Sequence, residues 1–157
     1  MLFRSGDEFP IYFAINALAL GAASMINAKL VMIYGMRYLS MRAMGTFCVI
    51  AVAFLPVVVA YDGVPPLWAF MAFCMSSFFC VSILFGNLNA MAMEPMGKIA
   101  GMAAALIGSA STLISLPIGV AIGQLFDGTL LPMVASFAVI GAAAFALLYK
   151  TSKISNE

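Results

Sequence analysis

Long apolar stretches separated by short polar clusters set the pattern of this chain. Seven basic and six acidic residues interrupt the sequence, and the stretches between them carry apolar side chains at nearly every position. A helix rises about 1.5 Å per residue, so about 20 apolar residues cross a hydrocarbon core of about 30 Å. The pattern predicts five membrane-spanning helices, over residues 9–33, 43–61, 66–91, 99–125 and 129–149.

The breaks between these stretches are short. They predict connections over residues 35–42, 62–66, 94–98 and 127–129, with a polar tail over 151–157. A membrane β-barrel is disfavoured, because barrel strands alternate in polarity over segments of about ten residues. We therefore expect one all-α integral membrane domain over residues 1–157.

Composition narrows the class further. Hydrophobic residues make up 65% of the chain and charged residues 8%, which excludes an ordinary soluble domain and a disordered one. The near-balanced charge leaves no basic surface for nucleic acid. There is no histidine, and the three cysteines lie in apolar runs without metal-site spacing. We therefore predict no catalytic residue, no metal site and no cofactor.

The charges predict how the chain is oriented. If the connections alternate between two sides, one side receives six of the seven basic residues, namely Lys29, Arg37, Arg42, Lys98, Lys150 and Lys153. The other side receives Arg4 with Asp7, Glu8, Asp62 and Asp127. Because cytoplasmic loops are enriched in Lys and Arg, the C-terminus should be cytoplasmic and the N-terminus outside. The expected location is the inner or plasma membrane of the cell.

Uncharged polar residues are the candidates for function within the spans. Asn16 and Asn27 are eleven residues apart, which places them on nearly one helix face, and Ser76 and Asn87 repeat that spacing. These residues would either line an aqueous or substrate cavity or form hydrogen bonds between helices. No charged residue lies at the middle of a predicted span, so the usual proton carriers of transporters are missing.

The fourth predicted span is rich in small residues. They recur at steps of three or four, and we single out Gly108, Ser115, Gly119 and Gly123 as helix-packing positions and Pro117 as a kink. Elsewhere, 13 methionines and 13 phenylalanines suit binding of a small amphipathic or apolar substrate, although lipid-facing positions accept the same side chains.

Two segments resemble a transporter family. The run from Asn87 to Gly108, NLNAMAMEPMGKIAGMAAALIG, resembles the connection between the tenth and eleventh helices of Bcr/CflA-type drug-resistance transporters, which belong to the major facilitator superfamily. Residues 13–18 (FAINAL), 27–30 (NAKL) and 35–37 (GMR) resemble the eighth helix and the loop after it. Gln124, Gly128 and Pro132 fall where the family's last loop is expected.

The resemblance implies that the five spans correspond to helices eight to twelve, part of the C-terminal six-helix bundle. It also implies that Gly35 and Arg37 belong to a cytoplasmic signature loop, although Met32 stands where that signature has an acidic residue. The family is similar to proton-driven antiporters that export drugs and small metabolites. Its coupling carboxylates would lie largely in an N-terminal half that this chain lacks.

Three function classes follow from these observations. The first is the C-terminal portion of a proton-coupled multidrug or small-molecule efflux antiporter, which would not transport alone. Its expected partners are the lipid bilayer and the missing N-terminal half or other partner helices. The second is a stand-alone or split-transporter membrane protein that acts by helix pairing with a partner subunit. An enzyme is the least supported class, because the chain has no histidine and no carboxylate within a predicted span.

Overall fold

Helices make up nearly all of the computed structural model, which describes residues 9–154. Five α-helices and one short 3-10 helix follow in order, and no strand occurs within these residues. The predicted all-α class is therefore confirmed. The elements are α1 (Phe9–Tyr34), α2 (Met36–Ala60), α3 (Leu67–Met93), η1 (Glu94–Ile99), α4 (Ala100–Gln124) and α5 (Leu131–Ile154).

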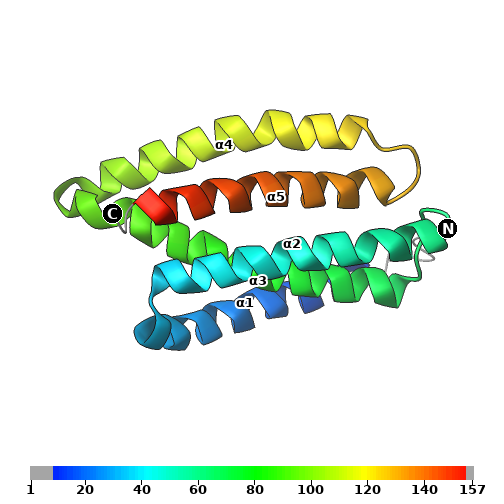
Figure 1. The fold of residues 1–157 in the computed structure, drawn as a ribbon, viewed down its shortest axis with the longest axis horizontal. Coiled ribbons are helices and arrows are strands. Elements are labelled where there is room, and N and C mark those ends of the chain that lie inside the picture. Colours follow the sequence, from blue (N-terminus) through cyan, green and yellow to red (C-terminus); the bar gives the residue numbers. More distant parts are fainter. Residues whose placement is uncertain (1–8, 155–157) are drawn as a thin grey trace.

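Four helical segments within the described part of the chain are long and apolar enough to cross a membrane. Three correspond to α1, α2 and α5, and the other runs from Leu67 to Gln124 through α3, η1 and α4. That segment is not one straight helix, because Met96 in η1 has φ −109° and ψ 22°. The chain turns back at η1, so that α4 runs in the opposite direction to α3 (Figure 1).

The helices pack around α2 and α3. α1 and α2 both lie against α3, α5 lies against the other side of α2, and α4 is outermost beside α5 (Figure 1). The buried side chains form two clusters, one toward each end of α3. One cluster contains Ala23, Leu39, Ala43, Ile83 and Leu84, and the other contains Phe54, Val58, Ala69, Phe73 and Val134.

Aromatic rings and one close backbone approach join α2 to its neighbours. Phe54 and Phe73 stack with ring centroids 4.4 Å apart and planes 10° from parallel. Gly141 on α5 faces the ring of Phe47, which an added Cβ would approach to 3.0 Å. A side chain at position 141 would therefore push α5 away from α2.

The first predicted connection is wrong in extent. Residues 35–42 were expected to link two spans, but α2 begins at Met36 and only Gly35 separates it from α1. Gly35 has φ 80°, a left-handed conformation that glycine adopts without steric cost, so one residue is enough to turn the chain. No proline or glycine follows until Gly45, so the helix continues through Arg37 and Arg42.

Of the other predicted connections, 62–66 and 127–129 are confirmed, whereas 94–98 forms the 3-10 helix η1 and α5 continues to Ile154, into the predicted tail. Residues 61–66 and 125–130 are non-helical, and the predicted loop over 94–98 falls in η1. The Leu130 N–H donates to the Gly63 carbonyl at 2.8 Å, which joins the α2–α3 and α4–α5 turns at one end of the bundle.

The two ends of the bundle differ in charge. Arg37, Arg42, Lys98 and Lys150, with one carboxylate, Glu94, belong to the end formed by the α1–α2 turn, η1 and the last part of α5. Asp62 and Asp127 belong to the turns at the opposite end. Other charges used in the orientation prediction, on residues 4, 7 and 8, lie outside the described residues, and the membrane side of each end stays a prediction.

Candidate functional site

Two asparagines predicted from the sequence pair with each other across α1 and α3. Asn27 Nδ2 donates to Asn87 Oδ1 at 2.8 Å, and Asn87 Nδ2 donates to Asn27 Oδ1 at 3.0 Å. Asn87 is only 2% exposed. Each amide thus satisfies the other within an apolar surrounding, where an unpaired amide would be costly. Of the two alternatives left open by the sequence, these two side chains adopt the interhelical hydrogen bond.

Asn16 continues this polar contact toward the opposite end of α1. Its Nδ2 donates to the Tyr12 carbonyl at 2.9 Å and lies 3.9 Å from Met71 Sδ on α3. Its Oδ1 is buried and has no hydrogen-bond partner. Asn16 and Asn27 therefore both face α3, whereas their eleven-residue spacing had predicted only that they share one face of the helix.

Ser82 belongs to the same interface, and the sequence analysis did not select it. Its hydroxyl donates to the Leu20 carbonyl on α1 at 3.1 Å, a bond between helices. The available signal was a lone serine in an apolar run, whereas Ser76 had been selected by its eleven-residue spacing from Asn87. We call Asn16, Asn27, Ser82 and Asn87 the polar seam, because they join α1 to α3 along most of their length.

Ser76 is not part of the polar seam. Its hydroxyl donates to the Ala72 carbonyl in its own helix at 2.8 Å, and the residue is exposed. It lines a hollow of about 380 Å³ between α2 and α3, together with apolar residues such as Phe54 and Trp68. The structure therefore brings Asn27 and Asn87 together and leaves Ser76 at a separate place.

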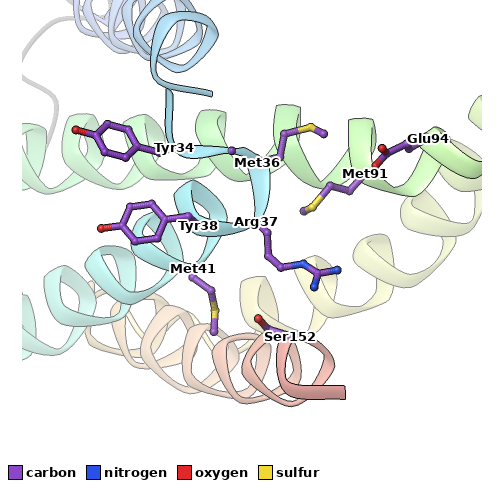
Figure 2. A pocket seen from close by; sticks show the side chains of 9 residues that line it. Tyr34, Met36, Arg37, Tyr38, Met41, Met91, Glu94 and Ser152 are labelled. Carbon is purple, nitrogen blue, oxygen red and sulfur yellow. The ribbon is translucent and has the colours of Figure 1, made fainter. Parts of the chain in front are cut away.

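The two residues of the predicted cytoplasmic loop line a larger hollow. Gly35 and Arg37 border a space of about 630 Å³ beside the α1–α2 turn, and the Arg37 side chain extends toward Ser152 and the end of α3 (Figure 2). Tyr34 and Tyr38 stack there with ring centroids 5.7 Å apart.

Arg42 is held against Tyr38 at the same end of the bundle. Its Nε donates to the Tyr38 hydroxyl at 3.2 Å, and its guanidinium carbon lies 5.3 Å from the ring centroid. A cation over an aromatic ring is attracted by the ring's electron density. Tyr38 thus orients one of the cations of the basic end.

The small residues selected on α4 meet no neighbour in the described chain. A Cβ added at Gly108, Gly119 or Gly123 would find no atom within 4 Å outside its own helix. Ser115 donates only to the Thr112 carbonyl, at 3.4 Å, and Pro117 lies inside the helix. The packing role of these positions stays a prediction, because the helix that would pack there is not among residues 9–154.

One carboxylate with a shifted pKa lies in the α4–α5 turn. The Thr129 hydroxyl and N–H donate to Asp127 Oδ1 at 2.7 and 3.0 Å. Both bonds lower the pKa of that carboxyl, and the hydroxyl bond has the larger effect. Within residues 9–154, no three His, Cys, Asp or Glu side chains come close enough to hold a metal ion.

The chain was also compared with known proteins. No family model, curated protein or solved structure matches it. The function therefore has to be argued from the residues and their geometry.

Proposed function

We propose that this chain is the C-terminal portion of a proton-coupled small-molecule efflux antiporter of the Bcr/CflA type in the major facilitator superfamily. It would lie in the cell membrane as a multi-pass protein, with α1 to α5 in the places of helices eight to twelve. Its N-terminal end would face outside and its C-terminal end the cytoplasm. Transport would require the N-terminal helices of such a protein.

The observation that carries this proposal is the isolation of α4. Only Ala103 is buried among the 25 residues of this helix. Apolar side chains alone would suit a lipid-facing helix, but three glycines with open space beside them favour the close approach of another helix. The open small-residue face of α4 supports the proposal that further helices complete the bundle.

Counting the crossings supports the same proposal. A continuous helix of 58 residues from Leu67 to Gln124 would be about 87 Å long, far more than a bilayer needs. The break at Met96 and the reversal of direction at η1 make α3 and α4 two separate crossings in this proposal. Five crossings place the basic end and the C-terminal end on one side, which the positive-inside rule assigns to the cytoplasm.

The position of the acidic groups argues that proton coupling depends on another part of the protein. Among the described residues, the carboxylates are Asp62, Glu94 and Asp127, and each lies in a turn or in η1. Proton relays in transporters use carboxylates within the membrane. Exchange of protons for substrate would then need two helical bundles, this one and an N-terminal one, that move around a binding site at the middle of the membrane.

Expression with and without a complementing fragment tests the proposal. The chain would be produced in efflux-deficient cells, alone and together with the first seven helices of a Bcr/CflA-type transporter. We expect protonophore-sensitive export of a fluorescent cationic dye only when both pieces are present. Proton-dependent export by the chain alone would contradict the proposal.

A matched pair of variants tests the role of α4. Gly119→Leu places a large side chain on the open face of α4, and we expect it to prevent co-purification of the two fragments. Ala142→Leu places the same side chain at an exposed position of α5 and should leave co-purification unchanged. Equal effects of the two variants would argue against α4 as the pairing helix.

The same open face of α4 favours a second candidate, a split-transporter subunit or stand-alone membrane protein that acts by helix pairing. The DNA upstream of this chain distinguishes the two. A continuous reading frame encoding seven further spans indicates one transporter, whereas a separate intact gene indicates a partner subunit.

A further inference from the structure

A hollow of about 500 Å³ lies between α2 and α5, which run side by side toward the basic end of the bundle (Figure 1). Three of its lining residues can donate hydrogen bonds: Arg42 and Thr46 on α2 and Tyr149 on α5. No carboxylate lines it, whereas Glu94 lines the larger hollow beside the α1–α2 turn. The hollow therefore offers positive charge and hydrogen-bond donors, and no partner for a cation.

The guanidinium of Arg42 is only partly used within the chain. Its Nε donates to the Tyr38 hydroxyl, and the cation lies over the Tyr38 ring. Its two terminal nitrogens have no hydrogen-bond or ion-pair partner among residues 9–154. Arg42 lies about 9 Å along α2, and the contact with Tyr38 holds its side chain back toward the start of the helix. The charge is thus held where the polar interface of a membrane would meet α2.

The Thr46 hydroxyl is also free to bind a ligand. Several hydroxyls in these helices, such as those of Ser76 and Thr112, donate to the carbonyl four residues earlier. Thr46 has no hydrogen-bond partner in the described part of the chain, and, unlike the buried and unpaired Ser77, it is exposed. Thr46 follows Arg42 by one helical turn, so the two side chains are neighbours on one face of α2. They can therefore bind one acceptor group together.

The rest of the hollow is apolar. A Cβ added at Gly45 would lie 3.6 Å from the Phe145 ring, so α2 and α5 approach closely there. Val49 and Ile50 continue the lining by one further turn toward the middle of α2, and Val49 is 68% exposed. An apolar surface that leads from the donors toward the middle of a membrane-spanning helix suits a hydrocarbon chain.

We propose that this hollow binds the headgroup and the adjoining acyl chain of an anionic phospholipid. The phosphate would accept hydrogen bonds from Arg42 and Thr46, and the acyl chain would lie along Val49 and Phe145. A zwitterionic headgroup fits less well, because no lining carboxylate is present to pair with its ammonium group. The proposal depends on the position of the chain in a membrane and not on the transporter assignment.

Two lipids with identical acyl chains test the selectivity for the headgroup. Dioleoylphosphatidylglycerol and dioleoylphosphatidylcholine would be titrated into the full chain in mild detergent, and native mass spectrometry would give the Kd of the first bound lipid. We expect about fivefold tighter binding of phosphatidylglycerol, as one basic residue near a membrane surface provides. Equal affinity for the two lipids would overturn the proposal.

A soluble headgroup distinguishes a lipid site from a site for free phosphate. Glycerol 3-phosphate carries the phosphate without acyl chains, and at millimolar concentration it should leave phosphatidylglycerol binding unchanged. Displacement of the lipid at that concentration would identify a phosphate site and overturn the assignment to a lipid.

A matched pair of arginine substitutions tests the position of the site. Arg42→Gln should lower the affinity for phosphatidylglycerol to that for phosphatidylcholine. Arg37→Gln removes the same charge from the same end of the bundle, but Arg37 lines the other hollow, so the preference for phosphatidylglycerol should persist. Equal weakening by both substitutions would indicate general attraction to the basic end and overturn the site.

Thr46→Val tests the site without disturbing the contact between Arg42 and Tyr38. Loss of one net hydrogen bond should weaken phosphatidylglycerol binding by about fivefold. Thr112→Val on α4 is the control, because that hydroxyl is bonded to the Gly108 carbonyl and lies outside the hollow. Thermal unfolding checks that each variant is folded, and unchanged affinity in a folded Thr46→Val chain would overturn the proposal.

Discussion

α3 and α4 are similar in length and hydropathy and very different in their surroundings. They have 27 and 25 residues, both are strongly apolar, and neither contains a charged residue. α3 buries seven side chains, from Ala69 to Asn87, against α1 and α2. α4 buries Ala103 alone.

The contrast teaches that hydropathy does not determine which helices pack together. Between helices in lipid, association depends on fit and hydrogen bonding, because lipid tails are as apolar as the side chains. α3 carries large rings such as Phe73 and an amide that finds a partner in Asn27. α4 carries glycines and small hydroxyl residues, which fit a closely approaching helix that residues 9–154 do not supply.

The largest difference between the two helices should appear when a large side chain is removed. Phe73→Ala on α3 removes the ring stacked on Phe54, and we expect the free energy of unfolding to fall by about 2–4 kcal/mol. Leu113→Ala on α4 removes a side chain that is 73% exposed and should change it by less than about 0.5 kcal/mol. Denaturant titration in mild detergent measures both, and similar losses would show that α4 is packed as tightly as α3.

A smaller effect is expected when bulk is added to glycines. Gly141→Leu on α5 meets the Phe47 ring and should lower the free energy of unfolding by about 1–3 kcal/mol. Gly108→Leu on α4 enters open space, so the isolated chain should keep its stability or gain slightly from helix propensity. The same titration measures both variants, and a destabilised Gly108→Leu chain would mean that α4 already has a neighbour.

The hydrogen bonds of the polar seam should contribute less to the free energy of unfolding than the side-chain packing does. Asn27→Leu leaves the buried amide of Asn87 unpaired, and we expect a loss of about 1 kcal/mol, with a coupling between the two asparagines of about 0.6–1.7 kcal/mol. A double-mutant cycle with Asn87→Leu measures that coupling. Asn89→Leu is the control, because Asn89 donates to Phe85 in its own helix, and it should show no coupling with Asn27.

The smallest expected effect concerns the turn that connects α4 to α5. The hydrogen bonds from Thr129 lower the pKa of Asp127 in the folded chain, so folding favours the ionised carboxylate. The resulting stability is present above the ordinary aspartate pKa of about 3.9 and disappears as the pH falls through the lower folded value. The melting temperature should therefore exceed that of Asp127→Asn near neutral pH, and the difference should shrink below about pH 4. A difference independent of pH would contradict this assignment.

Much of the helix pattern could be predicted from the sequence. The connections at 62–66 and 127–129 were found because turn-forming residues and charges interrupt the apolar runs there. The start of α2 was missed because charge was taken to mark the end of a helix. Arg37 and Arg42 can extend from a helix end into the polar interface, so charge does not require a break.

The candidate site was only partly predictable. Equal spacing identified Asn16 and Asn27 as sharing a face, but spacing within a helix carries no information about the helix opposite. Only the packing of α1 on α3 brought Asn27 to Asn87 and left Ser76 apart. The unpaired hydroxyl of Ser77 could not be found from the sequence, because Ser76 beside it gives the same local signal.

The sequence by itself determined the all-helical class, the approximate bounds of the helices and the unequal charge of the two ends. These properties are local: they depend on the length of apolar runs, on turn residues and on where charges fall. The tertiary structure decided which polar groups are paired, which are buried without a partner and which helix has few neighbours. Those properties depend on shape and hydrogen-bond geometry between distant segments, and an apolar run has the same sequence signature whether it faces lipid, a core or a missing partner.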